Sequence, residues 1–449
     1  MRRLQSKSPR FRRLWRAVCA RGSADDEAKV RRVSASIVAD VRARGDRALL
    51  EHTRRLDGWS PRRARDLTLG PDSFARAWRA IPASGRRALG LAARRILLFH
   101  EREEDARVPA FKDRWGATLA QVARPIARVG LYVPGGTARY PSSVLMSALP
   151  ALVAGVGEVV VASPGVRGSG ETDLWTLAAC HAAEVKLLHR VGGAQAVAAL
   201  AYGTESIRAV DKICGPGNAY VAAAKRLVYG RVDIDMVAGP SEVLVVADGS
   251  ADAAEVASDL IAQAEHDERA VAVLVSTSAL LADRVEVEVA RQLEELPRRE
   301  IARRSLEERG AIVVAAGLTE ALRLAEEFAP EHLALHARAA GRLVPRIARA
   351  GAVFVGRYTP EAVGDYVAGP SHVLPTAGTA RFASPLSVST FRRRMSVVEL
   401  ARKALLAVAP AVRSLARAEG LVGHWRAVEV RILKAKPAGP GRGGLGRRR

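Results

Sequence analysis

The chain shows two kinds of hydrophobic pattern. From Asp25 to about Arg124, apolar residues recur every three or four positions between long charged stretches, which is the spacing of amphipathic helices. From Ala127 onward, short apolar runs instead alternate with Ala- and Leu-rich helical stretches, and Gly or Pro joins them. Continuous apolar runs in this arrangement predict buried parallel strands of a doubly wound sheet. The first such runs are Val129–Val133, Glu158–Ala162 and Val185–Leu188.

A second set of strand-like runs follows the first and ends near Thr379. Residues 391–435 then return to helical spacing, but this segment is too small to hold a core of its own and could pack on a second subunit. We therefore predict an α/β protein with two tandem Rossmann-like, aldehyde-dehydrogenase-like doubly wound units, an N-terminal helical arm and a C-terminal helical dimerisation segment. The runs of the second set are Glu242–Val246, Ala270–Val275, Ala311–Ala315, Leu333–Leu335 and Ala352–Val355.

The formal net charge of +23 at pH 7 suggests at first a protein that binds polyanions. Fifteen of these charges, however, lie in residues 1–22 and 431–449, which contain no acidic residue. The remaining 408 residues carry an excess of only eight, so we do not expect the folded body to bind nucleic acid. We interpret the two ends as basic disordered extensions.

Two other interpretations of these ends stay open. The start of the chain resembles an organelle transit peptide, although the C-terminal end has the same composition and cannot be one. Alternatively, the protein is a basic binding protein whose ends engage nucleic acid or anionic surfaces. It would then show salt-dependent retention that is lost when residues 1–22 and 436–449 are deleted. We do not expect such contacts. The apolar residues at roughly helical spacing in the start are Leu4, Phe11, Leu14, Trp15 and Val18.

The cysteines and the apolar runs indicate a cytoplasmic protein. Three cysteines, Cys19, Cys180 and Cys214, are too few for a disulfide framework in a chain of 449 residues, which fits a reducing compartment. The longest apolar run, Val144–Gly157, is too short to cross a bilayer and contains Pro150. We therefore predict a cytoplasmic location and no membrane partner.

A glycine-rich turn is the first candidate binding feature. The turn Gly215-Pro216-Gly217-Asn218 precedes a helical run, and the N-terminus of a helix favours an anion such as a phosphate. Asp235 lies twenty residues after Gly215, near the place where a dinucleotide-binding fold has a ribose-binding acid. Tyr220 stands in place of the third glycine of that fingerprint, so the motif alone is weak and fits a helix cap equally well.

Two further glycine turns strengthen the case for a ligand crevice. Residues 135–136 and 192–193 are Gly-Gly pairs that follow predicted strands of the same α/β unit. Three such turns at the carboxyl ends of strands indicate one crevice. Cys214, directly before the third turn, could serve as a covalent nucleophile. We favour a small buried hydrophobe instead, because free Cys is usually part of the core and its neighbour Ile213 is apolar.

None of the nine histidines belongs to a compact zinc motif. Gln263 and His266 stand three residues apart on a predicted helix, so an amide oxygen and an imidazole share one face and could bind a cation together. On spacing alone, a polar helix end is the simpler interpretation. Glu331 and His332 place an acid and a base side by side at the edge of a strand, which suits proton transfer but also fits surface residues.

Several longer stretches resemble the histidinol dehydrogenase family. The likeness covers roughly residues 30–433, in the same order, and leaves the two ends outside. A match of this length makes coincidence negligible. The matching stretches are Val129–Met146, Val191–Leu200, Asp211–Tyr220, Ile234–Leu244, Ala257–His266, Ala329–Leu333 and Gly364–Pro375.

The resemblance implies a zinc-containing, NAD-dependent alcohol and aldehyde dehydrogenase. Such an enzyme oxidises L-histidinol through L-histidinal to L-histidine in two hydride transfers, the final steps of histidine biosynthesis. The family's mixed nitrogen and oxygen ligands suit one zinc ion per subunit, with positions left for the substrate. Carried over by position, the ligands are Gln263, His266, Asp365 and His424. These four residues also count among the substrate-binding positions.

The resemblance also implies roles for the other site residues. His332 takes the alcohol proton and later a proton of the hydrated aldehyde, and Glu331 activates the water that attacks the aldehyde. The family is homodimeric, with Glu419 and His424 completing the site of the partner. A related zinc- and NAD-dependent dehydrogenase of another polar alcohol is the alternative function. The substrate-binding positions include Ser241, His332, His372 and Glu419, and the cofactor-binding positions are Tyr132, Gln195 and Asn218.

With the resemblance, the predicted parts of the chain receive boundaries. Basic disordered ends occupy residues 1–22 and 436–449, and a helical arm occupies residues 23–125. The Rossmann-like NAD-binding unit spans residues 126–238, the second α/β unit with the zinc and catalytic residues spans 239–378, and the helical dimerisation tail spans 379–435.

Overall fold

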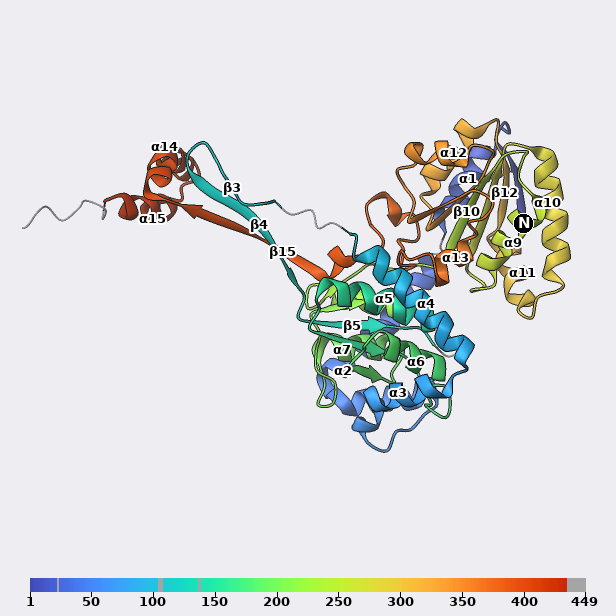
Figure 1. The fold of residues 1–449 in the computed structure, drawn as a ribbon, viewed down its shortest axis with the longest axis horizontal. Coiled ribbons are helices and arrows are strands. Elements are labelled where there is room, and N and C mark those ends of the chain that lie inside the picture. The colour runs from blue at the N-terminus through green and yellow to red at the C-terminus, as the bar shows by residue number, and fades with distance from the viewer. Residues whose placement is uncertain (22–23, 104–107, 136–138, 434–449) are drawn as a thin grey trace, which may run out of the picture. The chain divides into compact units, whose positions relative to one another are not determined.

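The computed structural model describes residues 1–21, 24–103, 108–135 and 139–433 (Figure 1). The chain divides into two compact units, of which the first contains residues 1–103 and 125–391 and the second residues 104–124 and 392–449. Within the described residues, the first unit holds two six-stranded sheets and the second a three-stranded sheet.

The first six-stranded sheet confirms the predicted Rossmann-like arrangement. Its strand order is β2-β7-β6-β5-β8-β9, and every pair is parallel except β2 with β7. Successive residues of a strand point to opposite faces of the sheet, so Val161 packs in one apolar cluster and Val160 in the other. Helices cover both faces and complete the two clusters. The strands are β2 (Thr68–Leu69), β5 (Arg128–Tyr132), β6 (Glu158–Ala162), β7 (Leu187–His189), β8 (Lys212–Cys214) and β9 (Asp233–Ile234). The helices are α2 (Ala24–Asp57), α3 (Pro71–Ala80), α4 (Ala83–His100), α5 (Pro141–Ala154), α6 (Leu174–Ala182), α7 (Gly193–Tyr202) and α8 (Ala219–Val228).

His189, at the end of β7, makes the stability of this sheet sensitive to acid. Its Nδ1 lies 3.0 Å from Oγ1 of Thr68 on β2, and burial lowers its pKa from 6.5 to about 4. In the unfolded chain this histidine is protonated below about pH 6.5, whereas in the folded chain it is protonated only below about pH 4. The free energy of unfolding therefore falls as the pH decreases from 6.5 to 4. Urea unfolding of the wild type should show a larger loss between pH 7 and pH 5 than unfolding of H189Q. An equal loss in both proteins would contradict this assignment, and H181Q, an exposed site on α6, is the control.

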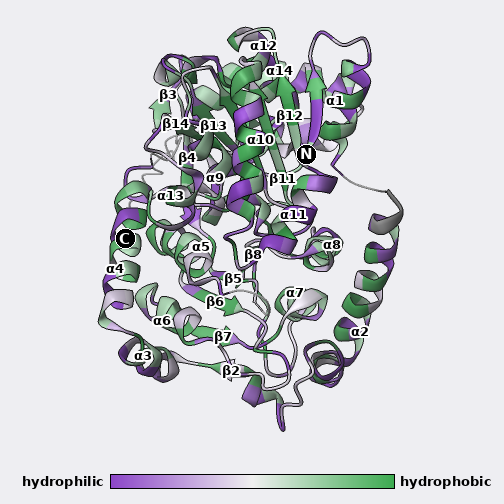
Figure 2. Ribbon diagram, turned by 90° about the vertical axis from the view of Figure 1, so that its right-hand side faces the viewer, coloured by the Kyte–Doolittle hydropathy of each residue, from purple (hydrophilic) through white to green (hydrophobic). Residues whose placement is uncertain are grey.

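The second six-stranded sheet is entirely parallel, with the order β1-β12-β11-β10-β13-β14. Its helices again lie on both faces: α1 and α12 pack on one cluster, and α9, α10 and α11 on the other. Figure 2 shows β11, β12 and β13 in the green of hydrophobic residues, whereas α10 mixes green and purple. The strands are β1 (Arg2–Gln5), β10 (Glu242–Ala247), β11 (Val271–Ser276), β12 (Ala311–Val314), β13 (His332–His336) and β14 (Ala352–Val355). The helices are α1 (Phe11–Ala20), α9 (Ala253–Ala264), α10 (Ala279–Leu293), α11 (Arg299–Glu308), α12 (Leu318–Phe328) and α13 (Glu361–Tyr366).

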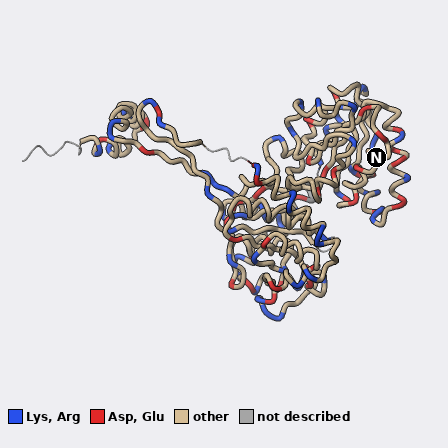
Figure 3. The backbone as a smooth tube through the Cα atoms, viewed as in Figure 1, with Lys and Arg blue, Asp and Glu red and all other residues tan. Residues whose placement is uncertain are grey.

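The prediction that residues 1–22 form a disordered basic extension was wrong for residues 1–21, which the structure describes. Strand β1 adds an edge to the second sheet by pairing in parallel with β12, and α1 packs on the same sheet. The apolar spacing of the segment, with Trp15 as its most buried residue, therefore decides its structure. Some of its positive charges have acidic partners, as in the ion pair between Arg12 and Glu327 on α12 at 3.1 Å. Figure 3 shows the same mixing of blue and red positions throughout the first unit.

The predicted helical arm is helical only in part. Helices α2, α3 and α4 are present, but residues 111–125 form a hairpin of β3 (Phe111–Lys112) and β4 (Ala117–Pro125). Asp113 fixes its turn, because its side chain accepts hydrogen bonds from the backbone N–H groups of Trp115 and Ala117, both at 2.9 Å. The left-handed backbone of Gly116 then turns the chain back, which a continuous helix would not allow.

The second unit also corrects the prediction for residues 379–435, which was helical throughout. Strand β15 (Arg392–Leu400) lies beside β4 in the three-stranded sheet β15-β4-β3, whereas α14 (Arg402–Ala418) and α15 (Val422–Leu433) are helical. A long strand is favourable here because β4 supplies its backbone partners. The predicted tail of residues 436–449 lies outside the described residues. Among those that are described, no helix combines the length and the apolar composition that a membrane crossing requires.

Candidate active site

The described residues of the three glycine turns follow β5, β7 and β8, at the carboxyl ends of parallel strands of the first sheet. Tyr132 ends β5, and its hydroxyl accepts a hydrogen bond from the backbone N–H of Gly193 at 3.0 Å. Asn218 caps α8, since its side-chain oxygen accepts the N–H groups of residues 220 and 221. Gln195, in the first turn of α7, is buried, and neither atom of its amide has a hydrogen-bond partner among the described residues. An unpaired buried amide beside such a crevice fits a bound ligand.

The third turn is held by a buried ion pair. Gly215 has a φ of +111°, and a Cβ there would lie 2.1 Å from the carbonyl oxygen of Tyr132, so only glycine fits. The Asp235 carboxylate accepts the N–H of Gly215 at 2.7 Å, and the Lys225 ammonium donates to the carbonyl oxygen of Gly215 at 2.9 Å. Lys225 and Asp235 also pair with each other. Asp235 is therefore a support of the turn rather than a ribose ligand, which corrects the role that its spacing suggested.

A second set of polar residues gathers at the amino edge of the second sheet. Glu331 and His332 lie at the start of β13, beside the start of β10. Helix α9 follows β10 and runs back across the sheet, so its last residues return to the same edge. This topology brings Gln263 and His266, at the end of α9, to the edge where β13 begins.

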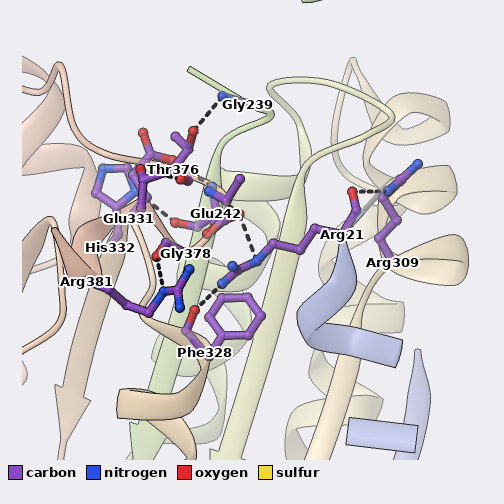
Figure 4. A network of polar contacts seen from close by, with 12 residues as sticks. Arg21, Gly239, Glu242, Arg309, Phe328, Glu331, His332, Thr376, Gly378 and Arg381 are labelled. Atoms are coloured by element: carbon purple, nitrogen blue, oxygen red, sulfur yellow. Dashed lines mark hydrogen bonds and ion pairs between the residues drawn. The ribbon is translucent and has the colours of Figure 1, made fainter. Parts of the chain in front are cut away.

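The backbone of Glu242 holds both members of the Glu331–His332 pair (Figure 4). Its N–H donates to the Glu331 carboxylate at 2.7 Å, and its carbonyl oxygen lies 3.0 Å from Nδ1 of His332. A carbonyl oxygen can only accept, so Nδ1 carries the proton and Nε2 is left as a free base. Burial lowers the pKa of His332 to about 4, which keeps the imidazole neutral, and burial raises the pKa of Glu331 well above its usual range. The pair is thus buried and oriented, and is not exposed on the surface.

The predicted metal ligands of the first unit come together in part. Nε2 of His266 lies 3.7 Å from the carboxylate of Asp365 on α13, and His372 lies at the same distance from the other oxygen of that carboxylate. Gln263 is buried, and neither atom of its amide has a partner among the residues that the structure describes. Within those residues, no three His, Cys, Asp or Glu side chains by themselves form a metal site. An amide, an imidazole and a carboxylate with unused donor atoms nevertheless fit zinc.

The remaining predicted residues are divided between the two units. His372 is held close to Asp365, since its Nδ1 lies 3.0 Å from the Asp365 carbonyl oxygen, and its Nε2 lies 3.2 Å from the Ser143 hydroxyl. Ser241 directly precedes β10. Glu419 directly follows α14 and His424 lies in α15, both in the second unit and both with exposed side chains.

Sequence reasoning missed two acidic residues of this edge. Glu361 begins α13, is only 2% exposed, and places a carboxylate oxygen 3.4 Å from Nδ1 of His332. Burial raises its pKa well above the usual range. Glu242 was assigned only to a strand. An acid at the start of a buried apolar run was the available signal for Glu242, whereas no local pattern marks Glu361.

Comparison with known proteins gives a uniform result. The sequence model described as histidinol dehydrogenase matches residues 20–432. The chain is 49% identical to a histidinol dehydrogenase of Chromobacterium violaceum over 437 residues, which is 97% of this chain and all of the relative. It is 48% identical to that of Pseudomonas aeruginosa, covering 98% of this chain and 99% of the relative. The crystal structure of a histidinol dehydrogenase from Elizabethkingia anophelis superimposes with a TM-score of 0.89 at 31% identity, over 97% and 98% of the two chains.

Proposed function

Because the chain belongs to the histidinol dehydrogenase family, we propose that it performs the last steps of histidine biosynthesis with NAD and zinc. The reaction oxidises L-histidinol to L-histidinal and then to L-histidine. One observation carries this proposal: the Glu331–His332 pair is buried and oriented at the same sheet edge as Gln263, His266 and Asp365. A base, a second acid and a set of cation donors are what an alcohol and aldehyde oxidation requires.

The two bases have separate tasks. When bound, NAD supplies the hydride acceptor and zinc supplies a cation that orients the substrate. The free Nε2 of His332 accepts the hydroxyl proton of the alcohol in the first step. Glu331 then removes a proton from the water that adds to the aldehyde, and His332 accepts the hydroxyl proton of the hydrate in the second step. Burial of both residues limits competing contacts with solvent.

The cofactor is proposed to bind in the crevice of the first sheet. Tyr132, Gln195 and Asn218 surround the three glycine turns, and the unpaired Gln195 amide is available for a polar group of NAD. The Lys225–Asp235 pair keeps the third turn in shape before the cofactor arrives. These features and the membership of the family are the support for NAD binding.

We propose a homodimer in which the second unit completes the site of the partner. Glu419 and His424 would then serve the other subunit, with His424 as the fourth zinc ligand. The second unit exposes an unusual number of large apolar side chains, which fits a surface covered by another chain. They include Val398, Leu415, Val422 and Leu433, each more than 60% exposed.

A related zinc- and NAD-dependent dehydrogenase of another polar alcohol would have similar ligands and bases. The retention of Ser241, His372 and Glu419 together favours histidinol. Growth of a histidinol-dehydrogenase-deficient strain on histidinol tests the choice, and failure of a well-expressed protein to support growth would favour the alternative.

Zinc content and product yield test the cofactors. Purified protein is expected to contain one zinc ion per subunit by elemental analysis and to form two NADH for each histidinol consumed. Q263L should lose zinc because the buried amide disappears, whereas H181A, on the surface of α6, should retain it. Activity in protein free of zinc, or a yield of one NADH, would contradict the proposal.

A further inference from the structure

Glu242 connects the active site to the N-terminal segment of residues 1–21. Its backbone N–H and carbonyl group bind Glu331 and His332, so a shift of Glu242 would move both bases together. The side chain of Glu242 is only 1% exposed. The position of this buried carboxylate therefore sets the position of the pair.

The carboxylate of Glu242 depends on one cation. Its Oε1 accepts the N–H of Ala377 at 2.9 Å, and Nε of Arg21 lies 2.9 Å from the same oxygen. The other oxygen, Oε2, has no hydrogen-bond partner in the described part of the chain. Burial raises the pKa of Glu242 to about 7, and Arg21 opposes this shift. Loss of Arg21 would leave a buried carboxylate without its countercharge, which a folded protein tolerates poorly.

Arg21 is itself fixed by the segment that leads into β13. Its guanidinium donates to the carbonyl oxygen of Phe328 at 2.5 Å and lies 3.6 Å above the centre of the Phe328 ring. Arg309 donates to the carbonyl oxygen of Arg21 at 3.3 Å. Figure 4 shows the guanidinium between Glu242 and Phe328. Arg21 thus joins the start of β10 to the residues just before Glu331.

From this network, we propose that Arg21 is a positioning residue for the reaction. Through Glu242 and Phe328 it fixes the relative places of the strand starts that carry Glu331 and His332. The N-terminal segment, whose basic composition suggested a disordered extension, then supports the active site through Arg21. The inference rests on the proposed function, because Glu331 and His332 are taken as the bases.

The test compares charge and shape at residue 21 in the full-length protein. R21M keeps an apolar stem but removes the cation, and R21K keeps the cation but loses the planar group over Phe328. We expect R21M to lower kcat about 10- to 100-fold while the KM for histidinol and for NAD stays within about twofold, because Arg21 contacts neither the predicted zinc ligands nor the predicted NAD-binding residues. R21K should recover part of the loss. R12M, on the outer side of the same α1 helix, is the matched control and should keep the wild-type kcat.

A double variant separates positioning from simple destabilisation. In R21M/E242Q no buried charge lacks a partner, and the amide can still accept the Ala377 N–H, so about half of the logarithmic loss in kcat should return while kcat stays below that of the wild type. If R21M does not fold, R21M/E242Q takes its place in the test. A reduced kcat of the double variant at a normal KM then supports the proposal, and a wild-type kcat overturns it. A kcat of R21M within about twofold of the wild type, or an equal loss in R12M, overturns it as well.

A structural readout keeps this inference independent of the activity. The crystal structure of R21M, or of R21M/E242Q where R21M does not fold, should show Glu242 displaced and its N–H no longer bonded to Glu331. An unchanged bond would overturn the proposal even if the wild type proved inactive on histidinol. Inactivity of the wild type together with a displaced Glu331 would instead reject the proposed function and retain the positioning role.

Discussion

E331Q should stop the oxidation after one hydride transfer. The Glu331 carboxylate accepts the Glu242 N–H at 2.7 Å, and a glutamine oxygen can accept the same bond, so the geometry should survive. The amide cannot take a proton from water, however, and a missing general base costs about 10²- to 10⁴-fold in rate. We therefore expect the aldehyde step to slow by that factor, while the alcohol step, in which His332 is the proposed base, changes much less.

Separate assays of the two steps provide the measurement. NADH formation from histidinal reports the aldehyde step alone, and a burst of one NADH from histidinol, followed by a slow phase, reports both. E327Q is the matched control, because Glu327 is an exposed partner of Arg12 on α12, outside the site. Two rapid NADH per histidinol in E331Q would show that Glu331 is not the base for water.

The two doubly wound sheets could be predicted because their strands are buried on both faces. Such strands consist of consecutive apolar residues, and the predicted run Glu242–Val246 differs from β10 by one residue. The edge strand β1 has no such signature, since three of its four side chains are exposed. Its place depends on backbone pairing with β12, more than 300 residues away, which no local pattern encodes.

The site shows the same limit. Gln263 and His266 could be paired from sequence because helical spacing puts them on one face. Asp365 lies on a short helix about 100 residues later, and the resemblance to a family was needed to find it. Arg21 gave no signal at all, because its partners are a strand start and a ring that only the tertiary structure brings near. Total charge, in turn, was a poor guide to the N-terminal segment, where apolar spacing decides the fold.

A mixture of two inactive variants should recover activity if the site is shared between subunits. H332A lacks the base of its own site, and H424A lacks the ligand that it would lend to its partner. In a mixed dimer, one site then receives both defects and the other receives none. With random exchange, half of the dimers are mixed and half of their sites are intact, so the mixture should reach about a quarter of the wild-type activity. Each variant alone should have almost none.

The control for this experiment is a mixture of two variants whose substitutions both lie in the first unit. H332A mixed with E331A should recover nothing, because both residues lie at the start of β13 and every site then contains at least one defect. Recovery in this control would indicate an exchange artefact. No recovery in the first mixture, despite proven exchange of subunits, would place Glu419 and His424 at the site of their own chain. The exposed apolar side chains of the second unit would then need a different partner surface, and the family's shared site would not extend to this protein.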